Sequence, residues 1–200
     1  MTREDILEAA LKAFARHGYD GMSMRELTRT MGVSHGLLHH YFDSKYDLWK
    51  ACIDHRFGGL TGELLLLLRD SAAQPDPSQA LREVIIALVT LSSQFPSFTA
   101  ILIQEGSVGG ERLDYILDTH FADLLVTGRA LVNRAIEQKL FRPIPWSTLI
   151  FSTFMGSISV FALAPMLQRM DDADPLAPEA VRQHAEALAD MLMFGLLNRK

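Results

Sequence analysis

Apolar residues recur at three- and four-residue steps along nearly the whole of this 200-residue chain. This helical period constrains the fold more than any other feature, because no stretch alternates apolar and polar residues as a half-buried strand does. Hydrophobic residues make up 48% of the chain, which is enough to build a buried core in one large domain or two small ones. The sequence therefore predicts an all-α fold.

Capping residues, glycines and prolines divide this pattern into about nine helices. Three short helices fill the first 42 residues, and their ends are marked by Ser23, Gly32 and Ser34. A fourth helix begins after Asp43 or Ser44 and continues to about residue 69. The remaining five are expected at about 77–94, from 96 to the glycines near 110, and at about 111–139, 146–164 and 178–197.

The segment from 143 to 167, PIPWSTLIFSTFMGSISVFALAPML, has no charged residue and is long enough to cross a bilayer. It also contains six serines and threonines, has prolines near both ends, and is flanked by no basic cluster that would orient it. We interpret it as a helix buried on several sides, stopped or kinked at Pro165, with a transmembrane span as the alternative. No membrane is expected as a partner.

Charge is distributed unevenly between the two parts of the chain. Residues 1–56 contain eight Lys/Arg, eight Asp/Glu and five of the seven histidines, so the whole net charge of −5 lies in residues 57–200. Because screening limits each charge to about 10 Å at moderate salt, the neutral first part can still present a basic face to phosphate.

Two features of the sequence indicate the cellular compartment in which the protein works. Cys52 is the only cysteine, so the chain forms no internal disulfide, as is usual in a reducing cytosol. The first residues, MTREDILEAALKAF, are charged from residue 3 onward and lack the unbroken apolar core of a signal peptide. We expect a cytoplasmic protein.

Three histidines are crowded into the stretch GVSHGLLHHYFDSKYDLW, residues 32–49. His35 and His39 have the i, i+4 spacing that can hold zinc on one helix face, but the sequence offers neither a third ligand nor an adjacent glutamate. The chain also lacks a G-x-S-x-G turn and a phosphate-binding glycine run. We therefore expect no metal site, no cofactor and no enzyme.

The same stretch has the features of a helix-turn-helix unit. Its turn, MGVS, places a glycine between two helices, followed by Val33 for burial and Ser34 as a cap. If Leu38 and Phe42 are buried, the opposite face of the third helix can enter a DNA major groove. His35, Gly36, Leu37, His39 and His40 would then face outward at least in part.

The sequence ILEAALKAFARHGYDGMSMRELTRTMGVSHGLLHHYFDSKYDLW resembles the DNA-binding domain of the TetR family of bacterial transcription regulators over about residues 6–49. The specific signal is the fixed spacing of F…G, S/T-x-x-x-L and GVS-x-G-x-L…YF-x-SK-x-x-L. The resemblance implies contacts with DNA for Arg25, Ser34, His35, Gly36, Leu37, His39, His40, Tyr41 and Lys45.

Lys45 falls at a phosphate-contacting position, where a helix N-terminus and an ammonium together make an anion site. Two positions depart from the family pattern: His39 replaces a common tyrosine, and Leu37 replaces a small or hydroxyl residue. These departures leave the preferred DNA sequence open.

The resemblance also implies a division into residues 1–46, the helix-turn-helix DNA-binding domain, and residues 47–200, an effector-binding and dimerisation domain. It implies an effector cavity between the fourth and eighth helices. Gln104 and His120 are polar groups among apolar helices, and we name them as candidate contacts to a small, largely apolar effector. The alternative is that each pairs with an ordinary neighbouring group.

Small or apolar residues lie on one side of each of the last two long helices. Such faces let helices approach closely, and we hypothesise that the two helices form a four-helix interface with their copies in a twofold dimer. The residues expected in this interface are Ser152, Gly156, Ser159, Ala185, Leu188 and Leu192.

Together these expectations describe a ligand-responsive, DNA-binding transcriptional regulator, more plausibly a repressor than an activator. A dimer would read a palindromic operator with two recognition helices one DNA turn apart, and a small-molecule effector would release it. The alternative is a helical protein-interaction module that has kept the fold without sequence-specific DNA binding. The sequence identifies neither the effector nor the operator nor the regulated genes.

Overall fold

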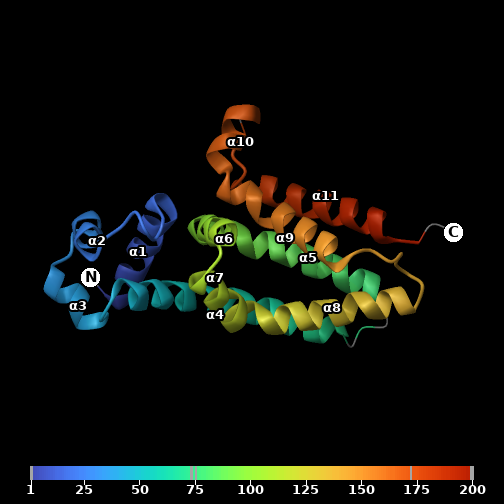
Figure 1. The fold of residues 1–200 in the computed structure, drawn as a ribbon. Helices are drawn as coiled ribbons and strands as arrows, with labels where there is room; N and C mark the ends of the chain where they lie inside the picture. The colour runs from blue at the N-terminus through green and yellow to red at the C-terminus, as the bar shows by residue number, and fades with distance from the viewer. Residues whose placement is uncertain (1, 73, 75, 172, 199–200) are drawn as a thin grey trace.

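The computed structural model describes residues 2–72, 74, 76–171 and 173–198, and this part of the chain is helical, as predicted (Figure 1). Its only strand-like pairing is an isolated bridge between Phe141 and Leu197. The elements are α1 (Arg3–His17), α2 (Met24–Met31), α3 (His35–Tyr41), α4 (Lys45–Ala72), α5 (Pro77–Ser93), α6 (Pro96–Val108), α7 (Glu111–Ile116), the π-helical turn η1 (Leu117–Phe121), α8 (Ala122–Glu137), α9 (Trp146–Ala162), α10 (Ala164–Asp171) and α11 (Pro178–Leu196).

Two elements differ from the sequence-based prediction. The single helix expected over 111–139 is divided into α7, η1 and α8, because five residues adopt the wider π-helical turn. A further helix, α10, follows α9 with a bend of 77° and projects from the body of the molecule (Figure 1). Pro165 lies in the first turn of α10, where a missing backbone N–H costs no hydrogen bond.

The apolar run from 143 to 167 is therefore bent rather than straight. In the described part of the chain no single helix is long and apolar enough to cross a membrane, although the bent pairs 77–108 and 146–170 meet that criterion by length and composition. The expectation that this run is buried on several sides is only partly right. Leu149, Ile158 and Phe161 are buried, whereas Phe151 is 67% exposed.

The first three helices form a small domain around the start of α4. The period in α1 predicted its inner face correctly, since Ile6, Ala10, Leu11 and Phe14 are all buried. Leu27 from α2, Leu38 from α3 and Trp49 from α4 complete the same core.

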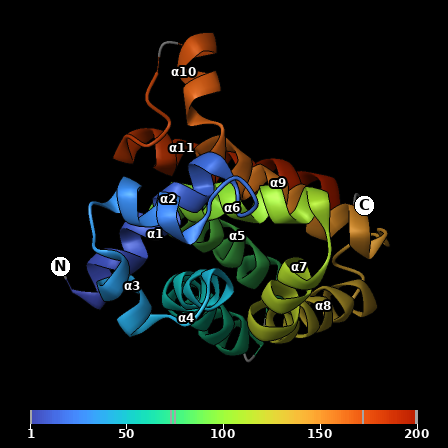
Figure 2. The same ribbon diagram turned by 60° about the vertical axis from the view of Figure 1, so that its left-hand side comes forward.

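The remaining helices form a bundle in which α5 is central, with α4, α8, α9 and α11 packed around it (Figure 2). Ile85 and Val89 of α5 are fully buried, and they belong to the apolar clusters shared with α9 and α11. Figure 1 shows α4 running from the small domain along the bundle. The expected domain boundary after residue 46 therefore lies inside one unbroken helix.

Tyr19, in the loop between α1 and α2, lies at the junction of the two parts. The ammonium of Lys45 lies 3.9 Å from the centre of its ring, and the guanidinium carbon of Arg112 on α7 lies 4.3 Å from it. Arg112 also bonds both carboxylate oxygens of Glu105, at 2.9 and 3.0 Å, and Asp20 at 3.3 Å. This arrangement ties the small domain to α6 and α7 of the bundle.

Candidate nucleic-acid interface and ligand cavity

The helix-turn-helix geometry follows from local hydrogen bonds. The Ser23 and Glu26 pair forms the predicted capping box at the start of α2. Gly32 ends α2 with φ at +68°, a left-handed conformation that glycine adopts without strain. The hydroxyl of Ser34 then accepts the backbone N–H of Leu37 at 3.1 Å and starts α3.

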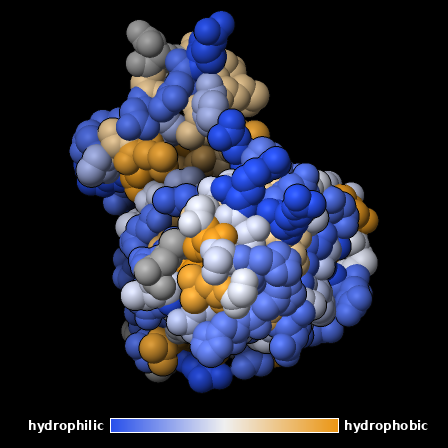
Figure 3. Space-filling view, turned by 90° about the vertical axis from the view of Figure 1, so that its left-hand side faces the viewer, coloured by the Kyte–Doolittle hydropathy of each residue, from blue (hydrophilic) through white to orange (hydrophobic). Residues whose placement is uncertain are grey.

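The outward face of α3 carries most of the predicted DNA-contacting residues. Leu38 is fully buried and Phe42 is 4% exposed, so they anchor the helix as expected. No described atom outside the local helix lies within 4 Å of the position that a Cβ of Gly36 would occupy. The backbone of α3 can therefore come close to another molecule at this point. Figure 3 shows that the end of the molecule formed by these helices is mostly hydrophilic. The exposed residues of the predicted set are Arg25, Ser34, His35, Gly36, His39, His40 and Tyr41.

One apolar position in this unit differs from expectation, since Val33, expected to be buried, is only half-buried. Tyr41, named as a DNA contact, is 39% exposed and lies beside His40, with ring centres 5.0 Å apart. Leu37 is half-buried against the core, so only part of its side chain can reach a base.

Lys45 lies at the first position of α4, where Ser44 caps the helix by accepting the Asp47 backbone N–H at 3.0 Å. Its ammonium donates to the Tyr19 carbonyl oxygen at 3.0 Å. This cation therefore lies at the domain junction, half-buried.

The histidine cluster lacks the surroundings of a metal site in the described residues. The His35 and His39 rings are 4.3 Å apart. No group of three His, Cys, Asp or Glu side chains is placed to hold a metal ion anywhere in the described ranges.

A cavity of about 390 Å³ lies inside the bundle, between α4, α5, α6, α7, α8 and α9. This position agrees with the expected effector cavity. Among the described residues, those that line it carry no charge, and only Thr153 and Trp146 have a polar side-chain atom. Leu117 and Phe151 line it and are 38% and 67% exposed, so the cavity reaches the surface beside them.

Neither polar residue suggested as an effector contact lines this cavity. The amide of Gln104 donates to the Ala15 carbonyl at 2.9 Å and so ties α6 to α1. His120 lies in η1 and faces α4, where its Nε2 is 2.9 Å from Asp54 Oδ1. Each therefore has a neighbouring partner in its own chain. His120 also lines a second hollow of about 380 Å³ with Thr61 and Asp118, so its contact with a ligand stays a prediction.

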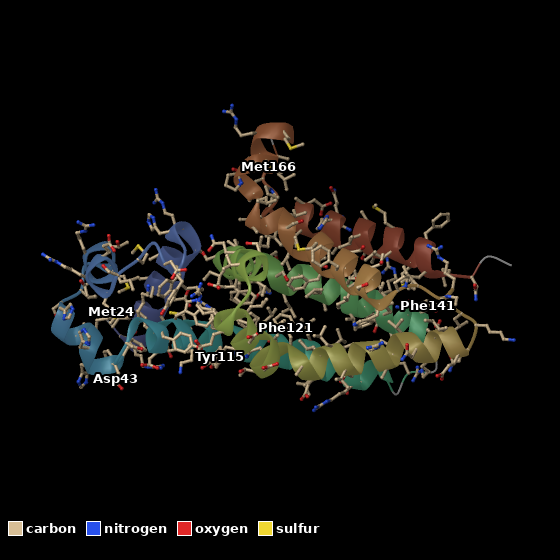
Figure 4. All side chains as sticks on the ribbon, viewed as in Figure 1. Met24, Asp43, Tyr115, Phe121, Phe141 and Met166 are labelled. Carbon is tan, nitrogen blue, oxygen red and sulfur yellow. The ribbon has the colours of Figure 1, made fainter. Side chains whose placement is uncertain are left out.

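The contacts of His120 form a polar cluster that sequence analysis did not identify. Asp54 on α4 accepts the Tyr115 hydroxyl at 2.7 Å as well as facing His120 (Figure 4 labels Tyr115 at this junction). The His120 ring stacks on the buried Phe57 ring, with centres 4.8 Å apart. Burial and the Asp54 carboxylate raise the pKa of Tyr115. We call Asp54, Tyr115 and His120 the α4 cluster.

No sequence signal pointed to the α4 cluster, because Asp54 is 61 residues from Tyr115 and 66 from His120. Its position is nevertheless informative. Phe121, which follows His120 in η1, lines the cavity (labelled in Figure 4). One π-helical turn thus contacts the cavity on one side and α4 on the other.

Some residues assigned to the dimer face also pack against another helix of their own chain. Ala185 is 1% exposed, and a Cβ on Gly156 would lie 2.9 Å from Leu188 Cδ1. Leu192 is half-buried against the bundle core. The small residues therefore let α9 and α11 of the same chain approach closely. Ser152 is exposed, and Gly156, Ser159, Leu188 and Leu192 are half-buried, so the place of these five in a dimer interface stays a prediction.

Comparisons with known proteins agree with this architecture. Residues 6–52 match the family model described as "Bacterial regulatory proteins, tetR family". The HTH-type transcriptional repressor NicS of Pseudomonas putida is 30% identical over 104 residues, which cover 52% of this chain and 48% of NicS. AcnR of Corynebacterium diphtheriae, also named a repressor, is 37% identical over 38% of this chain and 43% of its own.

The chain thus spans about half the length of these curated relatives. A third relative, the regulator RutR of Escherichia coli O157:H7, is 25% identical over 98% of this chain and 91% of its own.

Solved structures share the whole fold at low sequence identity. The ketosteroid transcriptional regulator KstR2 of Mycobacterium tuberculosis has a TM-score of 0.74 and 19% identity, covering 98% of this chain and 95% of its own. The TetR family transcriptional regulator PfmR of Thermus thermophilus has a TM-score of 0.71 and 22% identity, covering 100% and 99%.

The fold joins a helix-turn-helix domain, through one long helix, to a helical bundle that contains a cavity. This combination is a regulator fold, with the DNA-binding and cavity-containing parts in one chain. Residues 6–52 are thus similar to the DNA-binding part of the TetR family of bacterial regulatory proteins, and the whole chain shares its fold with regulators such as PfmR.

Proposed function

We propose that this protein is a dimeric transcriptional repressor that binds a palindromic operator and is released by a small apolar molecule. The observation that carries the proposal is the outward face of α3, with His35, Gly36 and His39 exposed above the buried anchors Leu38 and Phe42. Such a face fits a major groove. Repression is favoured because NicS and AcnR are named repressors.

Release is proposed to act through α4, the helix that both parts share. A ligand that occupies the cavity would press on Leu117 and Phe121 of η1. The same turn carries His120, which faces Asp54 nine residues beyond the start of α4. A different tilt of α4 would change the spacing of two recognition helices, which must lie about 34–36 Å apart on DNA.

A second connection runs through Arg112. Its partner Glu105 precedes Gly106, and Arg112 precedes Leu113; both of these neighbours line the cavity. On its other side Arg112 contacts Tyr19, which lies against Lys45. The coupling between ligand and operator is reciprocal and typically about 1–3 kcal/mol for such systems.

The dimer is proposed to use the outer sides of α9 and α11. Phe151 on α9 and Met191 on α11 are 67% and 72% exposed, together with the exposed Ser152. Exposed apolar side chains on two adjacent helices are typical of a helical self-association face. The same proposal places the protein in the cytoplasm, where chromosomal DNA lies.

The test is titration of the intergenic DNA upstream of the protein's own gene with wild type and Lys45→Ala. If Lys45 leaves Tyr19 to contact phosphate, the substitution weakens binding to all sequences and lowers the slope of log affinity against log salt by about one. Sedimentation of the complex should give two chains per palindromic site. A monomeric protein with unchanged affinity and salt slope would contradict the proposal.

An alternative use of the fold, as a protein-interaction module without DNA binding, is favoured only by the neutral charge of residues 1–56. Wild-type protein that does not discriminate its upstream DNA from unrelated DNA of equal length would support that alternative.

A further inference from the structure

The wall of the cavity indicates the chemical class of the effector, an inference that rests on the proposed function. Twenty residues line the cavity, and all carry aliphatic, aromatic or glycine surface except for the Thr153 hydroxyl and the Trp146 indole N–H. A volume of about 390 Å³ falls at the lower end of the roughly 300–1,000 Å³ usual for small-molecule sites. The wall thus suits a compact molecule with little polar surface.

In the described part of the chain no lining residue supplies a counter-charge for an ionised ligand. Arg112 lies next to the lining Leu113 in sequence, but its Nε is occupied by both carboxylate oxygens of Glu105. Arg129 lies over the Trp146 ring, with its guanidinium carbon 5.9 Å from the ring centre, and does not itself line the cavity. An unpaired charge in an apolar site is strongly disfavoured, because its lost hydration is not replaced.

We infer that the effector is an uncharged, predominantly hydrocarbon molecule with one or two hydrogen-bonding groups at most, and that the cavity rejects carboxylates and other ions. Apolar burial supplies the affinity. Thr153 and Trp146 both belong to α9, and among the described lining residues their hydroxyl and indole N–H are the side-chain groups that can orient a polar atom of the ligand.

Two fluorescent probes that differ mainly by one charge test the inference on the purified full chain. N-phenyl-1-naphthylamine is neutral, and 1-anilinonaphthalene-8-sulfonate is the same ring system with a sulfonate. We expect saturable binding of the neutral probe, and at least tenfold weaker binding of the sulfonate. Equal affinities for the cavity, or tighter binding of the sulfonate, would overturn the inference.

Gly128→Leu shows whether the probe is inside the cavity. Gly128 lines the cavity in the middle of α8, and a Cβ there meets only the Trp146 ring, at 3.8 Å. A leucine at this position fills the cavity, and it also favours the helix over glycine. We expect the neutral probe to lose at least tenfold in affinity. Undiminished binding would place the probe elsewhere and overturn the assignment.

Gly59→Leu is the matched control. Gly59 is also a helical glycine, on α4, but it is exposed, has no neighbour within 4 Å and does not line the cavity. The affinity of the Gly59→Leu variant for the neutral probe should equal that of wild type. Thermal unfolding followed by circular dichroism confirms that both variants are folded.

Operator titration separates this inference from the proposed function. If the protein binds its upstream DNA but not the neutral probe, the inferred ligand class is wrong and the proposed DNA-binding function is supported. If it binds the probe with the expected charge preference but binds no operator, the proposed DNA-binding function is wrong and the inferred ligand class is supported.

Discussion

The DNA-binding helices and the bundle helices are stabilised in different ways. α1, α2 and α3 each begin with a side-chain cap, from Thr2, Ser23 and Ser34. In the bundle α6, α7, α8, α9 and α11 have no side-chain cap hydrogen bond at their N-termini. α2 and α3 have only eight and seven residues, whereas α9 and α11 have 17 and 19.

This difference reflects what each region has to do. Helices of seven or eight residues are unstable alone, so the recognition unit depends on caps and on a few anchors that fix its outward face. Among the bundle helices α5 begins with a cap from Asp76, whereas α9 and α11 do without one and gain their stability from apolar contacts. Three substitutions test this contrast, in order of expected effect.

Leu38→Ala should have the largest effect. Leu38 is fully buried and is the main anchor of α3, so its truncation should cost about 2–5 kcal/mol of unfolding free energy and abolish operator binding. Denaturant unfolding and DNA titration measure the two losses. Leu66→Ala, at a leucine that is 62% exposed on α4, is the control and should change neither. Operator binding retained by Leu38→Ala would refute the role of this anchor.

Tyr115→Phe should have an intermediate effect, because it removes the hydroxyl that donates to Asp54 across the two regions. A hydrogen bond to a carboxylate is worth about 1.5–3 kcal/mol, and the exposure of Asp54 reduces this to about 1–2 kcal/mol. The check is a double-mutant cycle with Asp54→Ala, measured by denaturant unfolding. Additive losses would show that the α4 cluster does not link the two elements.

The same variant has a distinctive pH dependence. Since the pKa of Tyr115 is raised in the folded protein, its contribution to stability is complete below pH 10 and is lost as the pH rises through the folded pKa. Wild type should therefore lose stability above pH 10, and Tyr115→Phe should lose less. Parallel stability curves for the two proteins in alkali would argue against the hydrogen bond.

Ser23→Ala should have the smallest effect, about 1 kcal/mol, through loss of the α2 cap. Ser147→Ala, in the first turn of the uncapped α9, is the matched control in the bundle and should stay within about 0.5 kcal/mol of wild type. A similar loss in both variants would remove the contrast between the regions.

Acid pH provides a further test of the Ser23 cap. Hydrogen bonds from Ser23 lower the pKa of Glu26 below its ordinary 4.5. The contribution of Glu26 is therefore present above pH 4.5 and is lost as the pH falls through the folded pKa. The difference in stability between wild type and Ser23→Ala should shrink over that range when both are measured by denaturant unfolding.

The accuracy of the sequence-based predictions also differs between the DNA-binding domain and the bundle. In the DNA-binding domain, the caps Ser23 and Ser34 and the buried anchors Leu38 and Phe42 were predicted residue by residue. Tyr41, named as a DNA contact, is exposed on α3. In the bundle the site of the cavity and most helix ends were predicted, whereas α10 and the division of 111–139 were not. Gln104 and His120 have the neighbouring partners that the sequence left as the alternative.

The sequence by itself determined most of the helices, the caps of the first three, the recognition unit and its resemblance to the TetR family. These features depend on hydrogen bonds and apolar spacings that span three or four residues, and such short-range patterns can be read directly along a chain. Only the tertiary structure decided that Ala185 is buried against its own chain, that Asp54 meets Tyr115 and His120, and that six helices leave an uncharged cavity between them. Each of these depends on how residues far apart in sequence pack together, and no local pattern records that packing.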